Sequence, residues 1–294
     1  MKTELKGTIF IILAAIFSGI SVAINKLFVS TIDPVIFSAT RGLIIGIIFF
    51  AIIIFTSNLK KEFEKISWFK ILFIGIVGGG LAFLFFFSGL SMTTAIRASF
   101  LNKTLPIFTF AIGAIFLREK LQSKHFLALF FMLSGLILIE LLNVPKDVRV
   151  GDLLVIFATI LMAIEYSVSK SVMKTKSNWV VSFSRMFIGS IFLFLFALFV
   201  GKFDILLQLS FKQWSYILIS TSTLFFYILF WYLGLKNINL SKASALLLLA
   251  PPITLILSVI FLHEKIQSYQ LIGCFLILFG SYIISRIESE TRQP

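Results

Sequence analysis

Charged residues are scarce in this sequence. Asp, Glu, Lys and Arg together make up 13% of the 294 residues, whereas hydrophobic residues make up 59% and the mean hydropathy is +1.05. Soluble domains contain about 25% charged residues, which cover their water-facing surface. This composition therefore excludes an ordinary soluble protein and indicates an integral membrane protein.

Cysteine and histidine are also scarce. The single cysteine, Cys274, cannot form a disulfide within the chain, and the histidines, His125 and His263, have no cysteines or carboxylates around them at metal-ligand spacing. We therefore expect neither a metal site nor another cofactor. The spans contain a single deep carboxylate, Glu165, and no buried histidine, which argues against the converging acid, base and nucleophile of a membrane-embedded enzyme. The charge ring or repeated carbonyl filter of a channel is not evident either.

The apolar residues are concentrated in runs of roughly 20 residues, the length that a helix needs to cross a hydrocarbon core of about 30 Å. These runs are apolar on every side, which excludes a transmembrane β-barrel, and the first is too long for a signal peptide. The ten expected spans are Leu5–Val29, Pro34–Thr56, Ser67–Leu90, Thr94–Leu117, Ser123–Leu142, Gly151–Val172, Asn178–Val200, Gln213–Leu235, Ser241–Leu262 and Ser268–Arg286.

Lysine and arginine are unevenly distributed between the loops. If the N-terminus lies in the cytoplasm, 16 of the 26 Lys and Arg residues fall on the cytoplasmic side, eight fall on the other side, and Arg41 and Arg185 lie within spans. This bias is the positive-inside rule. It predicts cytoplasmic N- and C-termini in a lipid bilayer, and it accounts for the net charge of +13 without a nucleic-acid partner.

The chain contains an internal repeat. With a shift of 145 residues, Gly89–Ile139 aligns without a gap with Gly234–Ile284, and 18 of the 51 positions are identical. A shift of 144 residues aligns Gly7 with Gly151 at the start of each copy. Each copy holds five expected helices, and because five is odd, the second copy must enter the membrane from the opposite side. Inverted repeats are typical of secondary transporters, whose substrate site lies near the midplane between the halves.

Three features recur in both copies: S-x-x-R in the second helix, a proline midway along the fourth, and F-L-x-E-K-x-Q-S before a glycine-containing fifth helix. In these features the chain resembles the drug/metabolite transporter superfamily, specifically its EamA-type members. The resemblance implies an all-α integral membrane fold of ten transmembrane helices, arranged as two inverted five-helix repeats over residues 5–142 and 150–286. It also implies transport, in a superfamily that carries amino acids, drugs, nucleotide sugars and sugar phosphates.

The repeated polar corner has the composition of a structural connection. In the first copy, Lys120 complements the negative end of the preceding helix, and Ser123 is a good N-cap for the next one. Glu119 is expected to lie against the N-terminus of that next helix. The same arrangement is expected at the second corner, 145 residues later.

Ionisable residues inside a span are candidate functional residues, because each costs about 2.5–3.5 kcal/mol to insert. Glu165 lies roughly 21 Å into its span, on one stripe with Ser169. The repeat aligns this stripe with Ser18, Ser21 and Asn25, so both stripes are expected to face the centre between the halves. Glu165 is thus a candidate for lining the cavity and for carrying a coupling proton. Alternatively, it pairs with a neighbouring cation and only fixes helix packing.

Lys103 lies close to the middle of the fourth span, next to Asn102. Its repeat equivalent is Leu248, so the shared fold does not require a cation at this position. Three alternatives are open: a salt bridge to Glu165, a cationic anchor for a substrate carboxylate or phosphate, or an ammonium that reaches the interface.

Two sets of residues are expected to shape the cavity. Pro106 and Pro251 occupy equivalent positions, and each kinks its helix by removing a hydrogen bond; the kink either gates a cavity or only serves packing. In the eighth span, Thr223, Tyr227 and Trp231 recur at helical spacing with Ser220 and could line a pocket for an amphipathic solute. Trp231 alternatively belongs to an interfacial aromatic belt, so Tyr227 is the stronger candidate.

Other features favour structural roles. Arg41 and Arg185 occupy the same repeat position and are expected to bind carbonyl groups at helix C-termini. The glycines of Gly75–Gly80 and Gly42–Gly46 indicate close helix contacts rather than a phosphate cradle.

The sequence favours a carrier of amino acids, amphipathic metabolites or drugs, which works as an exporter in the plasma membrane by alternating access. The second choice is a sugar-phosphate or nucleotide-sugar exchanger, but it would need several cavity cations, and only Lys103 is a candidate. A membrane-embedded enzyme is the alternative of another class. A proton is one candidate for the coupling ion, and the sequence does not indicate the oligomeric state.

Overall fold

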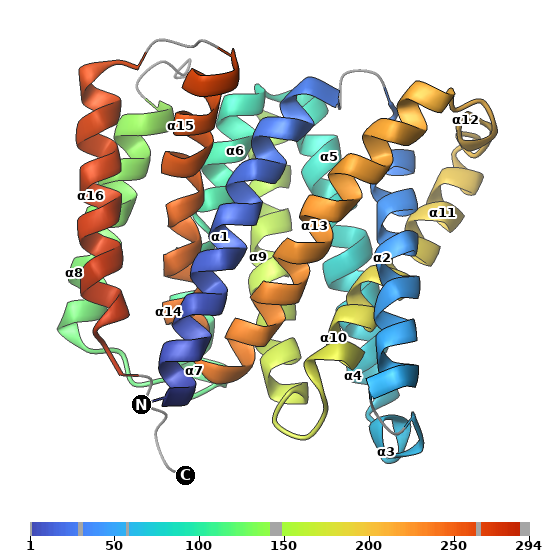
Figure 1. The fold of residues 1–294 in the computed structure, drawn as a ribbon, viewed down its shortest axis with the longest axis horizontal. Helices are drawn as coiled ribbons and strands as arrows, with labels where there is room; N and C mark the ends of the chain where they lie inside the picture. The colour runs from blue at the N-terminus through green and yellow to red at the C-terminus, as the bar shows by residue number, and fades with distance from the viewer. Residues whose placement is uncertain (1, 29–31, 57–58, 142–148, 263–265, 289–294) are drawn as a thin grey trace.

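The computed structural model describes residues 2–28, 32–56, 59–141, 149–262 and 266–288. Within these residues, ten helices are long and apolar enough to cross a membrane (Figure 1). They coincide with the ten expected spans to within a few residues, the first of them as α1, Lys2–Phe28. The prediction of an all-α membrane fold is therefore confirmed.

Five spans form each half of the chain. In the first half, the first two spans are α1 (Lys2–Phe28) and α2 (Pro34–Thr56), and the short α3 (Leu59–Phe63) follows them. The third span consists of α4 (Trp68–Phe73), the π-helical η2 (Ile74–Leu81) and α5 (Ala82–Met92). The fourth consists of α6 (Ala95–Lys103) and α7 (Leu105–Phe116), and the fifth of α8 (Ser123–Leu136) and the π-helical η3 (Ile137–Leu141). In the second half, α9 (Val150–Val172) is the sixth span, and the seventh consists of α10 (Asn178–Phe183), the π-helical η4 (Ser184–Ile188) and α11 (Gly189–Phe199). The short α12 (Asp204–Leu207) leads to α13 (Phe211–Asn237), which is the eighth span. The ninth consists of α14 (Leu240–Leu246), the 3₁₀ turn η5 (Leu247–Leu249) and α15 (Ala250–Leu262), and α16 (Ser268–Ser285) is the tenth.

The helices pack in pairs that a twofold axis would interchange. Helix α1 packs along α13 of the second half, and its counterpart α9 packs along α5 of the first half. Helix α8 packs against its own counterpart α16, and α2 packs against α10 and α11. In Figure 1, α1 begins at the end of the bundle where α9 ends. This arrangement confirms the two inverted five-helix halves.

Paired glycines allow two of these contacts. A Cβ atom on Gly151 of α9 would lie 2.5 Å from the carbonyl oxygen of Gly89 in α5, closer than real Cβ atoms approach. At the equivalent contact, a Cβ atom on Gly234 of α13 would lie 3.0 Å from the carbonyl oxygen of Gly7 in α1. Small residues let helix backbones approach this closely in membranes. The repeat therefore encodes the same backbone contact twice, once for each half.

The fourth and ninth spans are interrupted at equivalent places, as the prolines predict. Between α6 and α7, Thr104 donates its N–H to the Leu101 carbonyl, three residues back, at 3.2 Å. In the ninth span the 3₁₀ turn η5 occupies the same place. Pro106 and Pro251 are each the second residue of the segment after the break, where a missing N–H is tolerated. The prolines thus begin new helical segments rather than bending continuous ones.

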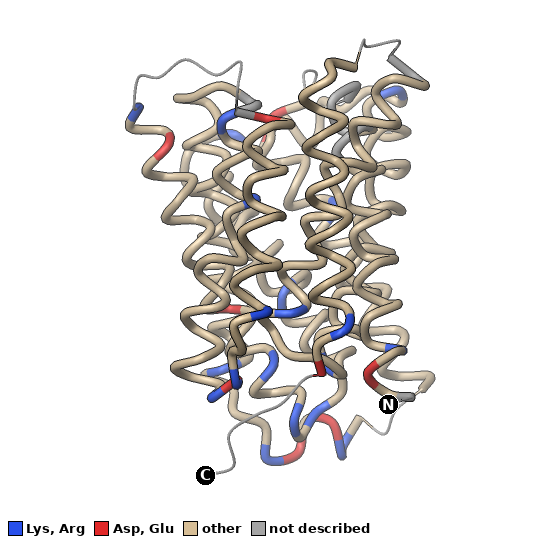
Figure 2. Tube along the Cα trace, turned by 90° about the vertical axis from the view of Figure 1, so that its left-hand side faces the viewer, with Lys and Arg blue, Asp and Glu red and all other residues tan. Residues whose placement is uncertain are grey.

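The two ends of the bundle differ in charge. Helix α1 begins and α16 ends at the same end, which also carries α3 (Figure 1). Lysine and arginine gather at this end more than at the opposite one (Figure 2). This distribution matches the asymmetry on which the predicted orientation rests.

The first polar corner differs from the prediction. Glu119 does not lie against the following helix; its carboxylate accepts hydrogen bonds from the N–H groups of Leu240 at 2.6 Å and Ser241 at 3.1 Å, at the N-terminus of α14 in the other half. The N-cap of α8 is Gln122 instead of Ser123, and the Gln122 N–H donates to the ring of His125. A carboxylate can accept hydrogen bonds at any helix N-terminus within reach. In this fold the N-terminus of α14, and not that of the following helix α8, lies within reach of Glu119. The corner residues 263–265 of the second copy lie outside the described residues.

Candidate functional site

The interrupted parts of the fourth and ninth spans face each other across the interface between the halves. They enclose a cavity of about 40 Å³, lined by Asn102, Lys103, Leu105, Pro106, Ser244, Leu247 and Leu248. One water molecule takes up about 30 Å³ of liquid, so in this conformation the cavity is closed to an organic solute. The structure thus places three of the predicted residues, Asn102, Lys103 and Pro106, beside one cavity that residues of both halves line.

One side of this cavity is closed by a contact between the two interrupted spans. The hydroxyl groups of Thr109 in α7 and Ser244 in α14 lie 2.5 Å apart and are buried. Their repeat equivalents, Thr254 and Ser99, have other partners: the Thr254 hydroxyl donates to the Gly19 carbonyl at 3.2 Å, and the Ser99 side chain bonds to a carboxylate. The two ends of the interface are therefore not in equivalent states.

Glu165 lies at the centre of a buried polar network. Its side chain is fully buried and pairs with the Arg185 guanidinium, which is 3% exposed. The Ser169 hydroxyl and the Tyr232 hydroxyl both donate to Oε1 of Glu165, the latter at 2.9 Å. Arg185 also donates to the Tyr232 hydroxyl at 3.3 Å. Of the alternatives for Glu165, pairing with a neighbouring cation is confirmed, and a salt bridge to Lys103 is wrong.

Close approach of the third and seventh spans positions this pair. The π-helical segments η2 and η4 pack against each other, and wide π turns occur often at functional sites. A Cβ atom on Gly78 would overlap the Glu165 side chain, and one on Gly79 would overlap the backbone of Arg185. The prediction of close packing for these glycines is confirmed. Arg185 binds a carboxylate instead of the predicted helix carbonyl groups, because α9 brings Glu165 within reach.

The equivalent arginine of the first half has a different environment. Arg41 is 6% exposed and donates to the Ser220 carbonyl at 3.2 Å, in the middle of α13 rather than at a helix C-terminus. Its guanidinium lies 4.6 Å from the centre of the Phe37 ring. No carboxylate pairs with Arg41 in the described part of the chain.

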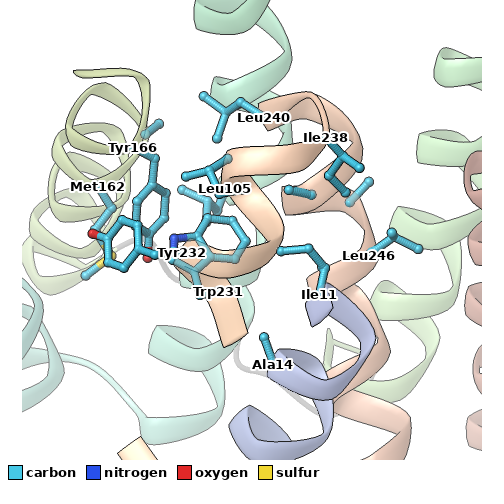
Figure 3. Close-up of a cluster of buried hydrophobic side chains, with 14 of the residues drawn as sticks. Ile11, Ala14, Leu105, Met162, Tyr166, Trp231, Tyr232, Ile238, Leu240 and Leu246 are labelled. Carbon is cyan, nitrogen blue, oxygen red and sulfur yellow. The ribbon is translucent and has the colours of Figure 1, made fainter. Parts of the chain in front are cut away.

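Four aromatic residues cover the Glu165 network. The rings of Tyr166 and Trp231 lie 4.7 Å apart between centres, and Tyr166 and Tyr227 place their hydroxyl groups 3.5 Å apart. Figure 3 shows Tyr166, Trp231 and Tyr232 packed together between α9 and the eighth span. Trp231 is fully buried, so its assignment to an interfacial belt is wrong, and its Nε1–H has no hydrogen-bond partner in the structure. The sequence analysis did not identify Tyr166 or Tyr232, although Tyr166 is adjacent to Glu165.

The remaining predicted residues are less central. Ser18 is half-buried and Ser21 is buried on α1, which packs against the ninth span. Thr223 is buried, but its hydroxyl donates within its own helix to the Ser220 carbonyl at 2.9 Å. The Nδ2 of Asn102 lies 3.6 Å from the sulfur of Met162, which links the cavity to α9. The side chain of Asn25 lies outside the described residues.

Lys103 faces a carboxylate that the sequence analysis did not identify. Glu140, in η3 at the end of the fifth span, interacts electrostatically with Lys103 and accepts a hydrogen bond from the Ser99 side chain. Glu140 is thus a second carboxylate that the fold encloses, at the end of its span. His125 is also buried, at 1% exposure, which corrects the expectation of no buried histidine.

Comparisons with known proteins agree with this architecture. The model of the EamA-like transporter family matches residues 5–141 and 149–286. "Uncharacterized transporter YyaM" of Bacillus subtilis (strain 168) is 25% identical over 274 residues, which cover 90% of this chain and 89% of that protein. An uncharacterized transporter of Methanothermobacter thermautotrophicus is 26% identical over 299 residues, which cover 96% of this chain and 86% of that protein. A crystal structure of another protein, 16% identical, superposes with a TM-score of 0.77 over 97% of this chain and 99% of its own, and this similarity concerns the fold alone.

Proposed function

This chain belongs to the EamA-like transporter family and is a multi-pass membrane transporter, and we propose that it carries small organic solutes by alternating access between its two halves. The observation that carries the proposal is the cavity between the two interrupted spans, which residues of both halves line, with Asn102, Lys103 and Ser244 as its polar residues. Discontinuous helices at the interface of inverted repeats are where secondary transporters bind their substrates. The repeats extend over residues 5–142 and 150–286.

The side chains of the site favour amino acids and amphipathic metabolites as solutes. Lys103 supplies one positive charge, Asn102 supplies an amide, and Tyr227 with Trp231 supplies aromatic surface nearby. A sugar phosphate or nucleotide sugar carries two or more negative charges, and Lys103 is the one cation that lines the cavity. The phosphate exchanger is therefore the second candidate, and no set of nucleophile and base supports an enzyme.

The contacts between the halves support a state closed toward the cytoplasm. With the termini in the cytoplasm, the Thr109–Ser244 contact and the Glu119 cap on α14 both lie in the cytoplasmic half of the interface. Alternating access would open these contacts and close the equivalent ones on the other side, which the inverted repeat makes possible. The same cycle carries solute in either direction, and we place export first.

Transport in reconstituted liposomes tests the proposal. Purified protein is reconstituted, and uptake of a labelled mixture of amino acids and small phosphorylated metabolites is measured, with protein-free liposomes as the control. We expect saturable uptake of amino acids that Lys103→Ala reduces at least tenfold. Preferential uptake of phosphorylated compounds would favour the exchanger, and no uptake by folded protein would contradict the proposal.

The orientation has a separate test in cells. On a Cys274→Ser background, a cysteine is placed at Lys202 or at Lys61, both of which are exposed. A membrane-impermeant maleimide applied to intact cells is expected to label the cysteine at position 202, and to label that at position 61 only after permeabilisation. The reverse pattern would contradict cytoplasmic termini in the plasma membrane.

A further inference from the structure

Glu140 differs from Glu165 in how well its carboxylate is satisfied. Glu165 has three donors, one of them its arginine partner, and Gly78 packs directly against it. Glu140 accepts from the Ser99 side chain, but its Oε2 is buried without a hydrogen-bond partner. An unsatisfied buried acceptor destabilises the fold, and more so if it is charged. Structural stability alone therefore explains Glu165 but not Glu140.

Lys103 is similarly incompletely satisfied, and it both lines the cavity and interacts electrostatically with Glu140. Its side chain lines the cavity, and no hydrogen bond to its ammonium is found among the described residues. The negative charge that acts on it is that of Glu140. A lysine that lines a cavity and has one electrostatic partner can exchange that partner for a ligand of the same charge.

The repeat indicates that this pair does not serve the shared fold. In the second half, Leu248 replaces Lys103 and Ser285 replaces Glu140, whereas Ser244 keeps the serine of position 99. Both charges are absent together from a half with the same five-span arrangement, although the π-helical η3 that carries Glu140 has no π-helical counterpart in α16. The fold can therefore be built without the pair, which leaves a role in binding or coupling.

We propose that a solute carboxylate displaces Glu140 as the counter-charge of Lys103, and that Glu140 takes up one proton when it is displaced. This inference rests on the proposed carrier function. The ligand class is a small monoanionic carboxylate, because one ammonium neutralises one negative charge and a dianion would leave an uncompensated charge in the membrane. The proton comes from the solution to which the cavity is open, forms an O–H bond on Glu140, and leaves with the solute on the other side.

The consequence is that solute and proton move in the same direction. A monoanionic carboxylate and one proton together carry no net charge. Net flux then follows the combined gradients, so export occurs from cells that accumulate the carboxylate, and an inward proton gradient opposes it. Glu140 replaces Glu165 as the group expected to carry the coupling proton.

The titratable groups around Glu140 decide whether another residue could cause a pH effect near neutrality. Helices α6, α8 and α16 pack against η3. Lys103 is the charged residue that acts on Glu140 from α6, and tyrosine, cysteine and lysine side chains ordinarily do not titrate between pH 5.5 and 7.5. Histidine does, so His125, near the other end of α8, needs a control. The other titratable residues on these helices are Arg97, Lys124, Tyr269, Cys274 and Tyr282.

The test measures isotopic counterflow of a labelled small carboxylate in proteoliposomes with equal pH on both sides. For the wild type, the half-saturation concentration is expected to rise by about tenfold per pH unit over the range where Glu140 is ionised, because binding takes up one proton. In Glu140→Gln it should be low and independent of pH. Glu140→Gln should also lose accumulation driven by a pH gradient while it keeps counterflow.

Control variants separate coupling from folding. His125→Gln should keep the wild-type pH slope. Lys103→Leu/Glu140→Ser, which copies the second half, should remain folded with a wild-type Tm and lose carboxylate counterflow by at least tenfold. If the Glu140→Gln variant kept the pH slope of the wild type, this inference alone would be overturned. Absence of carboxylate counterflow by a folded wild type that still takes up another solute would also overturn this inference alone, whereas absence of all uptake would overturn the proposed function as well.

Discussion

The buried pair of Glu165 and Arg185 gives the sharpest prediction for stability. The two side chains are 0% and 3% exposed, and they form an ion pair with each other. In Glu165→Gln, the Arg185 charge stays buried without a counter-charge, and the new NH₂ group faces the hydroxyl donors of Ser169 and Tyr232. Breaking a buried ion pair in this way costs about 3–5 kcal/mol. We therefore expect Glu165→Gln to be strongly destabilised.

Thermal unfolding in detergent measures this cost. One kcal/mol corresponds to about 2–4 °C in Tm for chains of 150–250 residues, so at the lower end of this range the expected fall is at least about 6 °C. Adding Arg185→Met should restore much of the loss, because the uncompensated charge is then removed. A double-mutant cycle gives the coupling energy directly.

Arg41 supplies the matched control for this experiment. It is buried at the equivalent position but donates to a carbonyl group and has no carboxylate partner in the described residues. Arg41→Met loses one hydrogen bond and relieves one buried charge, so its Tm should change by less than about 2 °C. Additive losses for Glu165→Gln and Arg185→Met, or a fall in Tm below about 2 °C for Glu165→Gln, would refute the reasoning.

Three further predictions concern packing and capping. Glu119→Ala leaves the two N–H groups at the start of α14 without an acceptor, at about 1–3 kcal/mol each. The Tm should therefore fall in Glu119→Ala, and it should fall less in Glu119→Gln. Equal falls in Tm would contradict capping by the carboxylate. Trp231→Phe removes an unpaired N–H and should leave the Tm nearly unchanged, whereas Trp231→Ala should cost about 3–5 kcal/mol. Gly151→Val forces α5 and α9 apart and should abolish the monodisperse peak in size-exclusion chromatography. A normal peak would contradict the close contact. Asp204→Ala, on the short α12, serves as the control.

Much of the fold followed from two properties of the sequence. The lengths of the apolar runs predicted the ten spans, because the thickness of the bilayer fixes the length of a crossing helix. The odd number of helices per repeat predicted the inversion. The pairing of Gly7 with Gly234 and of Gly89 with Gly151 was not predicted, although these four positions align in the repeat and carried the signal.

The partners of the ionisable residues could not be predicted from the repeat. Glu119 bonds to α14 of the other half, and a repeat shows that two corners are alike without showing what they contact. Glu165 and Arg185 were both singled out, but their pairing depends on how η2 and η4 bring two spans together. Glu140 was missed because it ends an apolar run and looks interfacial. The signal was the joint loss of charge at positions 248 and 285.

The central claim is that the cavity between the two interrupted spans opens alternately to each side of the membrane. A cysteine at Leu248, which lines this cavity and is 1% exposed, tests it on a Cys274→Ser background in proteoliposomes with impermeant maleimides. The account predicts labelling from the outer side and, in separate samples, from the inner side, with both rates slowed by a transported carboxylate. Labelling from one side only, or at rates that no transported solute changes, would contradict alternating access through this cavity.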